Sequence, residues 1–369
     1  MKKILIVFGT RPEAIKMAPL VKELYGESGF DTKVCVTAQH REMLDQVLDF
    51  FSIQPDYDLN LMKANQTLNQ LSARILTAID VVLIDFEPDL VLVHGDTSTS
   101  SMVALAAFHR GIKIGHVEAG LRTYNKFAPF PEEINRQITG KLADIHFAPT
   151  QQSAKNLLNE GVLSNTVHIT GNTVIDALLW GIKNVNKERE DIQEINTFLD
   201  PNKKLIVVTG HRRENFGTQF YEFCSALKDL ATRDDVQLIY PVHLNPNVQK
   251  AVYDTLGGHD NILLIAPLDY EAFIWLLDQS YLIITDSGGV QEEAPSLKKP
   301  VLVTREVTER QEAVEQGTVK LVGTNKEKIL KEANLLLDDQ KVYKNMIGNK
   351  NPYGDGSASK QIVTALKQS

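Results

Sequence analysis

"KILIVFGTRPEAIKMAP", residues 3–19, decides the fold class of this chain. After the lysine, residues 4–8 are an uninterrupted apolar run followed by glycine, which is typical of a short strand buried on both faces. The remaining letters open a helix, and Pro12 is well placed for a first helical position. A buried strand, a tight turn and a helix in this order indicate a doubly wound α/β domain.

Similar apolar runs recur along the whole chain, and they are continuous rather than alternating. Such runs predict parallel strands covered on both faces by crossover helices. They fall into two series, which predict two Rossmann-like doubly wound domains, and a length of 369 residues also favours two domains. We place the joint near the polar residues 171–200, which gives a first domain of residues 1–172 and a second of 173–356. The runs are "KILIVFG", "TKVCVTA", "DLVLVHGD", "KIGHVEAG" and "IHFAPT", then "KLIVVTGH", "VQLIYPVH", "NILLIAP", "YLIITDSGG", "PVLVTRE" and "TVKLVGT".

The composition narrows the class of protein. A net charge of −8 without a Lys/Arg block argues against nucleic acid as a partner. Cys35 and Cys224 each lie in an apolar run, which predicts buried, reduced thiols. The first apolar run is too short for a signal peptide, and no stretch reaches the roughly 18 apolar residues that span a bilayer. We therefore expect a cytoplasmic protein with no membrane segment.

The unusual residues gather where the predicted strands end. Ligands of open α/β sheets bind beyond the carboxyl ends of the strands. If the strand ends of the two domains face each other, these residues share one interdomain active-site cleft, and this clustering indicates an enzyme. The residues are Thr10, Arg11, Gln39, His40, the stretch 94–97, Glu118, the stretch 211–214, His243 and the stretch 286–289.

Two turns are typical of anion binding. Arg11 and Lys16 flank a predicted helix N-terminus, where backbone N–H groups and the helix dipole favour a negative charge. In "ITDSGGVQEEAPSL", residues 284–297, the Ser-Gly-Gly turn lets the backbone approach a phosphate, although alone it could be a plain helix cap. Glu292 or Glu293 would suit a ribose diol. Neither G-x-G-x-x-G nor a Walker A loop occurs, so the sequence disfavours NAD.

Acidic residues follow two of the strands in the first half. Glu118 ends an apolar strand within "HVEAGLRTYNKFAPFPEEINR", residues 116–136, and has no helix to cap. Asp96 either caps the next helix or has a functional role, and the sequence does not decide between them. Glu132 and Glu133 are either functional or favourable first-turn acids. The histidines are scattered and neither H-E-x-x-H nor CxxC occurs, so we predict no metal.

Taken together, several motifs in order along nearly the whole chain resemble the non-hydrolysing UDP-N-acetylglucosamine 2-epimerases of bacteria. The resemblance implies a glycosyltransferase-B-like fold whose C-terminal helix, here residues 357–369, packs back on the first domain. It also implies a homodimer that interconverts UDP-N-acetylglucosamine (UDP-GlcNAc) and UDP-N-acetylmannosamine (UDP-ManNAc) without a cofactor, supplying cell-surface polysaccharide. The motifs are "FGTRPEAIKMAP", "HGDT", "HVEAGLRT", "PEEINR", "GHRRENFG", "TDSGGVQEEAPS", "TER" and "NPYGDGSAS".

The resemblance assigns roles to residues at matching positions. Catalysis would fall to Asp96, Glu118, Glu132 and His211, with His211 near the diphosphate. A second UDP-GlcNAc, acting as an activator, would bind at Gln39, Gln66, Arg212 and His243. Leu268 departs from relatives that place a glutamine there to meet the base. The implied substrate contacts are Arg11, Lys16, Asp96, Glu118, Arg136, His211, Phe273, Ser287, Gly288, Gly289, Glu293 and Arg310.

The implied reaction explains why several acids would be needed. The proton on sugar C2 is not acidic, because no carbonyl is attached to that carbon. Loss of UDP together with this proton gives 2-acetamidoglucal, and UDP then adds back with a proton delivered to the opposite face. Two proton transfers on two faces require more than one acid–base group. The alternatives are a hydrolysing epimerase, a glycosyltransferase of the same fold and a non-catalytic UDP-sugar sensor.

Overall fold

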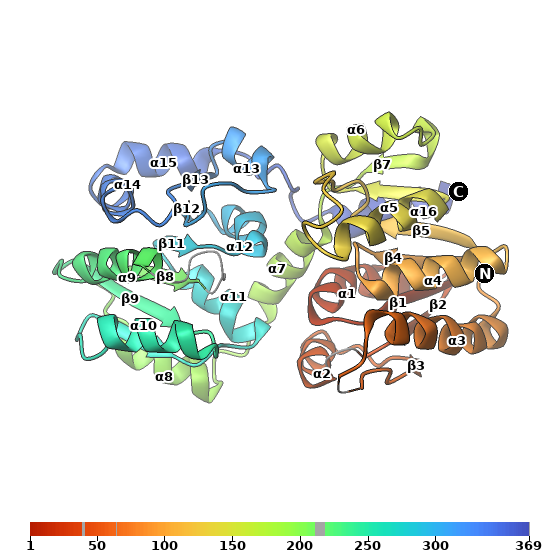
Figure 1. The fold of residues 1–369 in the computed structure, drawn as a ribbon, viewed down its shortest axis with the longest axis horizontal. Helices are drawn as coiled ribbons and strands as arrows, with labels where there is room; N and C mark the ends of the chain where they lie inside the picture. Colours follow the sequence, from red (N-terminus) through yellow and green to blue (C-terminus); the bar gives the residue numbers. More distant parts are fainter. Residues whose placement is uncertain (39–40, 64, 211–217, 369) are drawn as a thin grey trace. The chain divides into compact units, whose positions relative to one another are not determined.

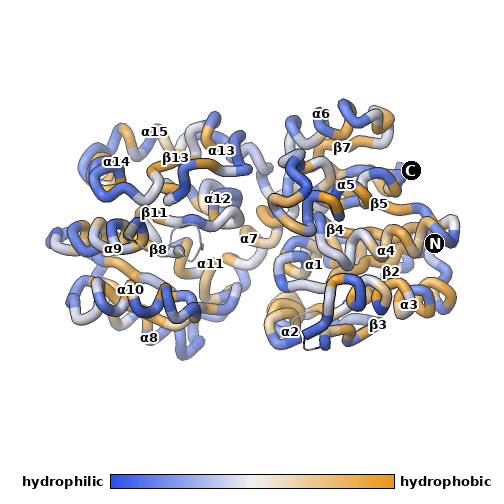
Figure 2. Tube along the Cα trace, in the orientation of Figure 1, coloured by the Kyte–Doolittle hydropathy of each residue, from blue (hydrophilic) through white to orange (hydrophobic). Residues whose placement is uncertain are grey.

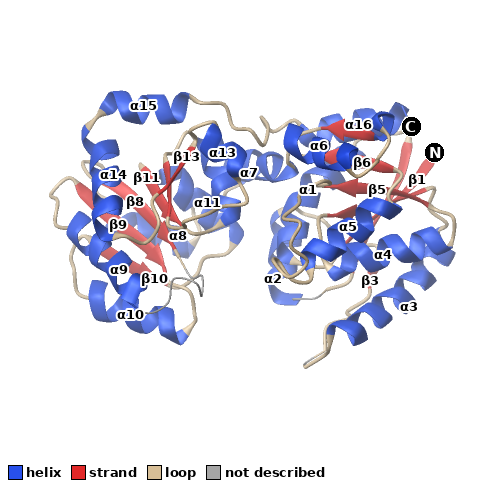
Figure 3. Cartoon of the chain, turned by 45° about the horizontal axis from the view of Figure 1, so that its top comes forward, coloured by secondary structure: helices blue, strands red, loops and turns tan. Residues whose placement is uncertain are grey.

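The computed structural model describes every residue except 39–40, 64, 211–217 and 369, and the chain divides into two compact units. Unit 1 comprises residues 1–177 and 353–369, and unit 2 comprises residues 178–352. In each unit, helices lie on both sides of a parallel sheet, as Figure 3 shows. The two Rossmann-like α/β domains predicted from the sequence are confirmed.

The described part of unit 1 forms a seven-stranded parallel sheet in the order β3-β2-β1-β4-β5-β6-β7 (Figure 1). The order reverses between β1 and β4. Helices α1, α2 and α16 pack beside one another, and α3, α4 and α5 form a second packed group. The elements are β1 (Lys2–Phe8), α1 (Arg11–Tyr25), β2 (Phe30–Val36), α2 (Arg41–Phe50), β3 (Tyr57–Asp58), α3 (Leu68–Phe86), β4 (Leu90–His94), α4 (Ser98–His109), β5 (Lys113–Val117), α5 (Glu132–Leu142), β6 (Ile145–Ala148), α6 (Gln151–Asn159), β7 (Val167–Ile169), α7 (Thr173–Asn184), which crosses into unit 2, and α16 (Ala358–Gln368).

Unit 2 repeats the architecture with six described strands, in the order β10-β9-β8-β11-β12-β13. Its order reverses between β8 and β11. The elements are α8 (Glu190–Phe198), β8 (Lys204–Thr209), α9 (Thr218–Leu230), β9 (Val236–Pro241), α10 (Pro246–Leu256), β10 (Ile262–Ile265), α11 (Tyr270–Gln279), β11 (Leu282–Thr285), α12 (Gly288–Glu293), β12 (Val301–Val303), α13 (Gln311–Glu315), β13 (Val319–Leu321), α14 (Lys326–Asp338) and α15 (Gln340–Gly348).

The central strands of both sheets are buried along their whole apolar length. In β1 every residue from Ile4 to Phe8 has no exposed surface, and the same holds for Ile206 to Val208 in β8. Strands with helices on both faces must be apolar at every position, so continuous runs rather than alternating ones specify them. The predicted burial of Cys35 and Cys224 is confirmed, and both are free thiols.

Two strands were not predicted. Strands β3 and β7 have two and three residues, and all of these residues are half-buried or exposed. Both lie at the edges of the unit 1 sheet, where a long apolar run is not required. Among the residues that the structure describes, no helix combines the length and the apolar composition needed to cross a bilayer.

Candidate active site

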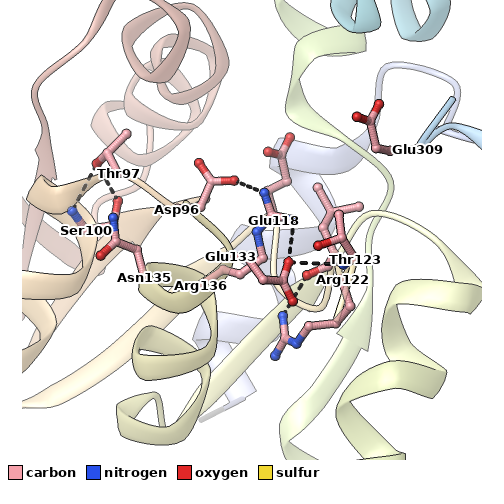
Figure 4. Close-up of polar contacts among 12 residues, drawn as sticks. Asp96, Thr97, Ser100, Glu118, Arg122, Thr123, Glu133, Asn135, Arg136 and Glu309 are labelled. Atoms are coloured by element: carbon pink, nitrogen blue, oxygen red, sulfur yellow. Dashed lines mark hydrogen bonds and ion pairs between the residues drawn. The ribbon is translucent and has the colours of Figure 1, made fainter. Parts of the chain in front are cut away.

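Three turns of unit 1 meet at the carboxyl end of its sheet. Arg11 begins α1 after β1. Asp96 follows β4 and Glu118 follows β5, and both are labelled in Figure 4. Strands β1 and β4 are neighbours at the point where the strand order reverses, and β5 pairs with β4. Such a reversal is the usual ligand-binding position of an open α/β sheet. The predicted gathering of these residues therefore occurs within unit 1.

Glu118 is held in place by its backbone and by two donors. Its φ is 62°, a left-handed conformation that costs a non-glycine residue roughly 1–3 kcal/mol and is common at functional sites. Its side chain is 8% exposed and forms an ion pair with Lys16 through Oε2. The same oxygen accepts a hydrogen bond from Asn172 Nδ2 at 2.8 Å. Glu118 is thus a fixed, buried carboxylate at the end of a strand.

The surroundings of Glu118 favour its ionised form. Burial alone would raise its pKa, but the charge of Lys16 and the hydrogen bonds from Lys16 and Asn172 outweigh burial and lower the pKa. His94 Nε2 lies 3.8 Å from the same carboxylate oxygen. Burial lowers the pKa of His94 to about 4, so this histidine is neutral at pH 7 and Lys16 is the cation that stabilises Glu118.

Asp96 does not cap the helix that follows it. The cap of α4 is Thr97, whose hydroxyl accepts a hydrogen bond from the Ser100 N–H at 3.1 Å, so the capping alternative for Asp96 is excluded. Asp96 instead forms an ion pair with Arg136 from α5, which Figure 4 shows. Burial raises the pKa of Asp96; Arg136 opposes this shift and the charge of Glu118 adds to it. Neighbouring strand ends therefore carry two acids whose pKa values are shifted in opposite directions.

The two acids at the start of α5 differ in their environment. Glu133 has no exposed surface and accepts hydrogen bonds from the Thr123 and Tyr124 N–H groups, each at 3.0 Å, and from Arg136 at 3.3 Å. It therefore fixes the loop before α5 and orients Arg136. Glu132 is only half-buried, and no hydrogen bond or ion pair among the described residues involves its side chain. Of the two, Glu132 is the acid whose carboxylate is not occupied by other described residues.

Sequence reasoning missed Glu13. This buried carboxylate accepts hydrogen bonds from the Gly9 and Thr10 N–H groups at 3.0 and 2.8 Å. Its other oxygen accepts from the hydroxyls of Thr97 at 2.7 Å and Ser100 at 3.1 Å. Glu13 thus ties the turn that carries Arg11 to the turn that carries Asp96. The capping box T-x-x-E at residues 10–13 was the signal that could have identified it.

In unit 2 the Ser-Gly-Gly turn follows β11 and packs against an arginine. Ser287 precedes α12, and Arg310 Nε donates to Glu292 Oε1 at 2.9 Å. A Cβ atom on Gly288 would lie 2.8 Å from the Arg310 Cζ, so only glycine lets the guanidinium lie against this turn. The predicted ribose contact Glu293, next in sequence, is 7% exposed. The turn and Arg310 therefore form one local cluster in unit 2.

The remaining predicted residues lie on several different elements of the two units or are not described. Phe273 is half-buried on α11, and Leu268 lies between β10 and α11. Gln66 lies before α3, and its Nε2 donates to Met62 Sδ at 3.0 Å. His243 is exposed after β9. Gln39, His40 and the stretch 211–214, which includes His211 and Arg212, lie outside the described residues.

The fold is that of a two-domain α/β protein, consistent with a glycosyltransferase-B-like architecture, and its first unit carries paired acids and cations at the ends of its strands. A family model described as UDP-N-acetylglucosamine 2-epimerase matches residues 22–367. The chain belongs to the UDP-N-acetylglucosamine 2-epimerase family, and the resemblance to its non-hydrolysing bacterial members is confirmed.

Similar proteins match over essentially the full chain. The UDP-N-acetylglucosamine 2-epimerase of Escherichia coli K12 is 56% identical over 369 residues, which cover 99% of this chain and 98% of the relative. The UDP-GlcNAc 2-epimerase of Neisseria meningitidis, whose crystal structure is bound to UDP-GlcNAc, has a TM-score of 0.89 at 49% identity, with 100% of both chains covered. A putative epimerase from Listeria monocytogenes has a TM-score of 0.93 at 49% identity, covering 100% of this chain and 96% of that one.

Proposed function

We propose that this chain interconverts UDP-GlcNAc and UDP-ManNAc by removing and returning the proton at C2 of the sugar. Family membership and the bound UDP-GlcNAc of the Neisseria meningitidis relative support the substrate. The observation that carries the reaction is the pair Glu118 and Asp96, two acids on neighbouring strand ends with pKa values shifted in opposite directions. Such pairs typically divide acid and base roles.

The proposed reaction balances without a cofactor. In an anti elimination, a carboxylate takes the C2 proton while the bond between C1 and the UDP oxygen breaks, which gives 2-acetamidoglucal and UDP. In a syn addition, UDP forms the C1–O bond again and a carboxylic acid delivers a proton to the other face of C2. The net result is inversion at C2. Because UDP carries the electron pair of the broken bond, neither an oxidant nor a free carbanion is required.

Each residue would then have a physical role. Glu118, ionised by Lys16, is suited to accept a proton, and Asp96, with its raised pKa, is suited to hold one. Glu132 is a third candidate for the second transfer. The charge that grows on the leaving diphosphate would be stabilised by cations and N–H groups. We assign this stabilisation to Arg11, Lys16, Arg136, His211, Ser287, Gly288, Gly289 and Arg310, with Phe273 and Glu293 contacting the nucleoside.

One incubation tests the proposed function. Purified protein is incubated with UDP-GlcNAc alone and the products are separated by chromatography. UDP-ManNAc is the expected product. Free ManNAc with UDP would instead identify a hydrolysing epimerase, and an unchanged substrate would leave a glycosyltransferase or a sensor.

We also propose a homodimer. Helices α3 and α4 pack side by side, and the apolar stretches along them are visible in Figure 2. Three large apolar side chains on these helices are exposed: Val81 by 65%, Ile84 by 55% and Phe108 by 58%. Exposed apolar side chains on two adjoining helices favour a protein partner, and a second copy of the chain would cover them. Sedimentation velocity should give twice the chain mass of 41.2 kDa, and a monomer would contradict the proposal.

A second UDP-GlcNAc bound at Gln39, Gln66, Arg212 and His243 stays a prediction. With such an activator site, we expect the rate to depend sigmoidally on the UDP-GlcNAc concentration. We also expect little reverse reaction from UDP-ManNAc alone. Hyperbolic kinetics in both directions would contradict it. The further proposals, that the enzyme works in the cytoplasm and that its product feeds cell-surface polysaccharide, follow from the family resemblance alone.

A further inference from the structure

Asn172 is a buried residue with a fixed amide orientation. It lies between β7 and α7, is 3% exposed, and its backbone N–H donates to the Tyr353 carbonyl at 2.7 Å. Its Oδ1 accepts the Val174 N–H at 3.1 Å, in the manner of an N-cap of α7. Because an N–H group occupies Oδ1, the NH₂ end of the amide faces Glu118 and cannot be exchanged with the oxygen end.

The two oxygens of the Glu118 carboxylate have different surroundings. Oε2 accepts from Lys16 and, at 2.8 Å, from Asn172 Nδ2, and it lies 3.8 Å from His94 Nε2. Oε1 has no hydrogen-bond partner among the described residues. It faces the turn after β4, where a Cβ atom on Gly95 would lie 3.6 Å away. One oxygen is therefore occupied by two donors and the other is available.

We propose that Asn172 is a positioning residue that holds Oε2 of Glu118 and so leaves Oε1 as the atom that exchanges the C2 proton. The proposal rests on the proposed function, because it names the atom through which Glu118 would act. An oxygen that already accepts two hydrogen bonds is a poor proton acceptor, so the proton goes to the other oxygen. The donors also prevent the carboxylate from rotating about its terminal bond, which keeps Oε1 in one place.

The other charged groups around Glu118 come from separate elements. Lys16 approaches from α1, His94 from the end of β4, and Asp96 from the turn that follows it, where Arg136 pairs with Asp96. Since Lys16 alone cannot fix a carboxylate in one orientation, the second donor supplies the direction. Removing the Asn172 donor should leave Glu118 paired but able to rotate, with a higher pKa.

The variant Asn172→Asp separates positioning from packing. It keeps the volume, the backbone bond to Tyr353 and the acceptor for the Val174 N–H, but it removes the donor and sets a second carboxylate beside Oε2. Asn325→Asp is the matched control, because Asn325 is the N-cap of α14 in unit 2 and its side chain accepts the Lys328 N–H at 2.9 Å. Asn172→Ala removes the donor without adding charge.

The readout is the pKa of Glu118, followed by ¹³C NMR of labelled carboxyl groups and assigned by its loss in Glu118→Gln. We expect the pKa to rise by at least about one unit in Asn172→Asp and to rise less in Asn172→Ala, with an unchanged value in Asn325→Asp. An added carboxylate and a lost hydrogen bond to the charged form both act in this direction. An unchanged pKa in both Asn172 variants would overturn the proposal, whether or not the wild type is active.

Kinetics supply the second readout. In Asn172→Asp, kcat should fall at least tenfold and the acid limb of its pH profile should move to higher pH, whereas Asn325→Asp should match the wild type. In a Glu118→Gln background, Asn172→Ala should cause no further loss, because Asn172 acts through Glu118. A further loss of kcat in this background would mean that Asn172 has only a structural role. A wild type that does not convert UDP-GlcNAc would reject the proposed function, while the titration would still report whether Asn172 holds Glu118.

Discussion

The two units use the same fold but present different chemistry at their strand ends. In unit 1 the acids Glu118 and Asp96 are paired with Lys16 and Arg136, and their pKa values are shifted in opposite directions. In unit 2 the described turn after β11 presents glycines packed against Arg310. In the proposed function, this difference assigns proton transfer to unit 1 and nucleotide binding to this turn of unit 2. Substitutions of the two acids of unit 1 should therefore act on kcat, and those of the turn after β11 in unit 2 on substrate affinity.

The largest expected effect comes from removing an acid of unit 1. Glu118→Gln or Asp96→Asn keeps the size of the side chain but not its acid–base function, so kcat should fall by about 10²–10⁴. Glu293→Gln is the counterpart in unit 2 and should raise KM more than it lowers kcat. Steady-state kinetics with UDP-GlcNAc and calorimetric UDP affinities give both quantities. If the substitutions in unit 1 raised mainly KM and Glu293→Gln lowered mainly kcat, the proposed division of roles would be wrong.

The next effect concerns the cations that would meet the diphosphate. Arg11→Ala should lower kcat by roughly 10²–10³, the range for losing one group that stabilises a developing anion. His211→Ala is expected to behave alike. Arg11 begins α1 at the end of the sheet rather than in the core, so the melting curve should stay close to that of the wild type. A near-normal kcat with an unchanged melting curve would remove the residue from the mechanism.

A smaller effect tests the packing of the turn in unit 2. In Gly288→Ala the new Cβ would meet the Arg310 Cζ at 2.8 Å and displace the guanidinium, whereas in Gly289→Ala the nearest atom would be 3.8 Å away. We expect UDP affinity to fall about tenfold more in the first variant, which corresponds to about 1.4 kcal/mol. Calorimetry measures the difference. If both variants lost the same UDP affinity, the position of Arg310 against Gly288 would not be the reason for the loss.

The smallest effect is on stability in acid and should arise in unit 1. Burial lowers the pKa of His94 to about 4 and that of His116 to about 3, whereas unfolded histidine titrates near about 6.5. The unfolded chain thus binds more protons below that pH, so stability falls as the pH drops from 6.5 towards 4. Melting temperatures across this range should decrease, and His116→Asn should flatten the decrease. A slope unchanged by this substitution would assign the acid sensitivity to other groups.

The sequence predicted the sheets well because their strands are buried on both faces. Runs such as residues 4–8 can only be apolar there, and this requirement is readable without contacts. Strands β3 and β7 were missed because short edge strands do not need an apolar run. Which face each helix covers depends on strand order, which no local pattern encodes.

The site was predicted in part, and the misses have a common cause. Glu118 and Lys16 stood out because a charged residue ended a strand or flanked a helix start. Asn172 and Glu13 did not, because their partners are 54 and 84 residues away and each also looks like an ordinary helix cap. The capping alternative for Asp96 could be excluded only when the structure gave that role to Thr97.

The central claim, that carboxylates of unit 1 carry the C2 proton, is tested most directly by the reaction in D₂O. UDP-GlcNAc is incubated with the enzyme in D₂O, and the C2 position of the UDP-ManNAc formed is read by ¹H NMR and mass spectrometry. A proton that passes through a carboxylic acid exchanges with solvent, so the account predicts deuterium at C2 of the product. Complete retention of the original C2 hydrogen would contradict it.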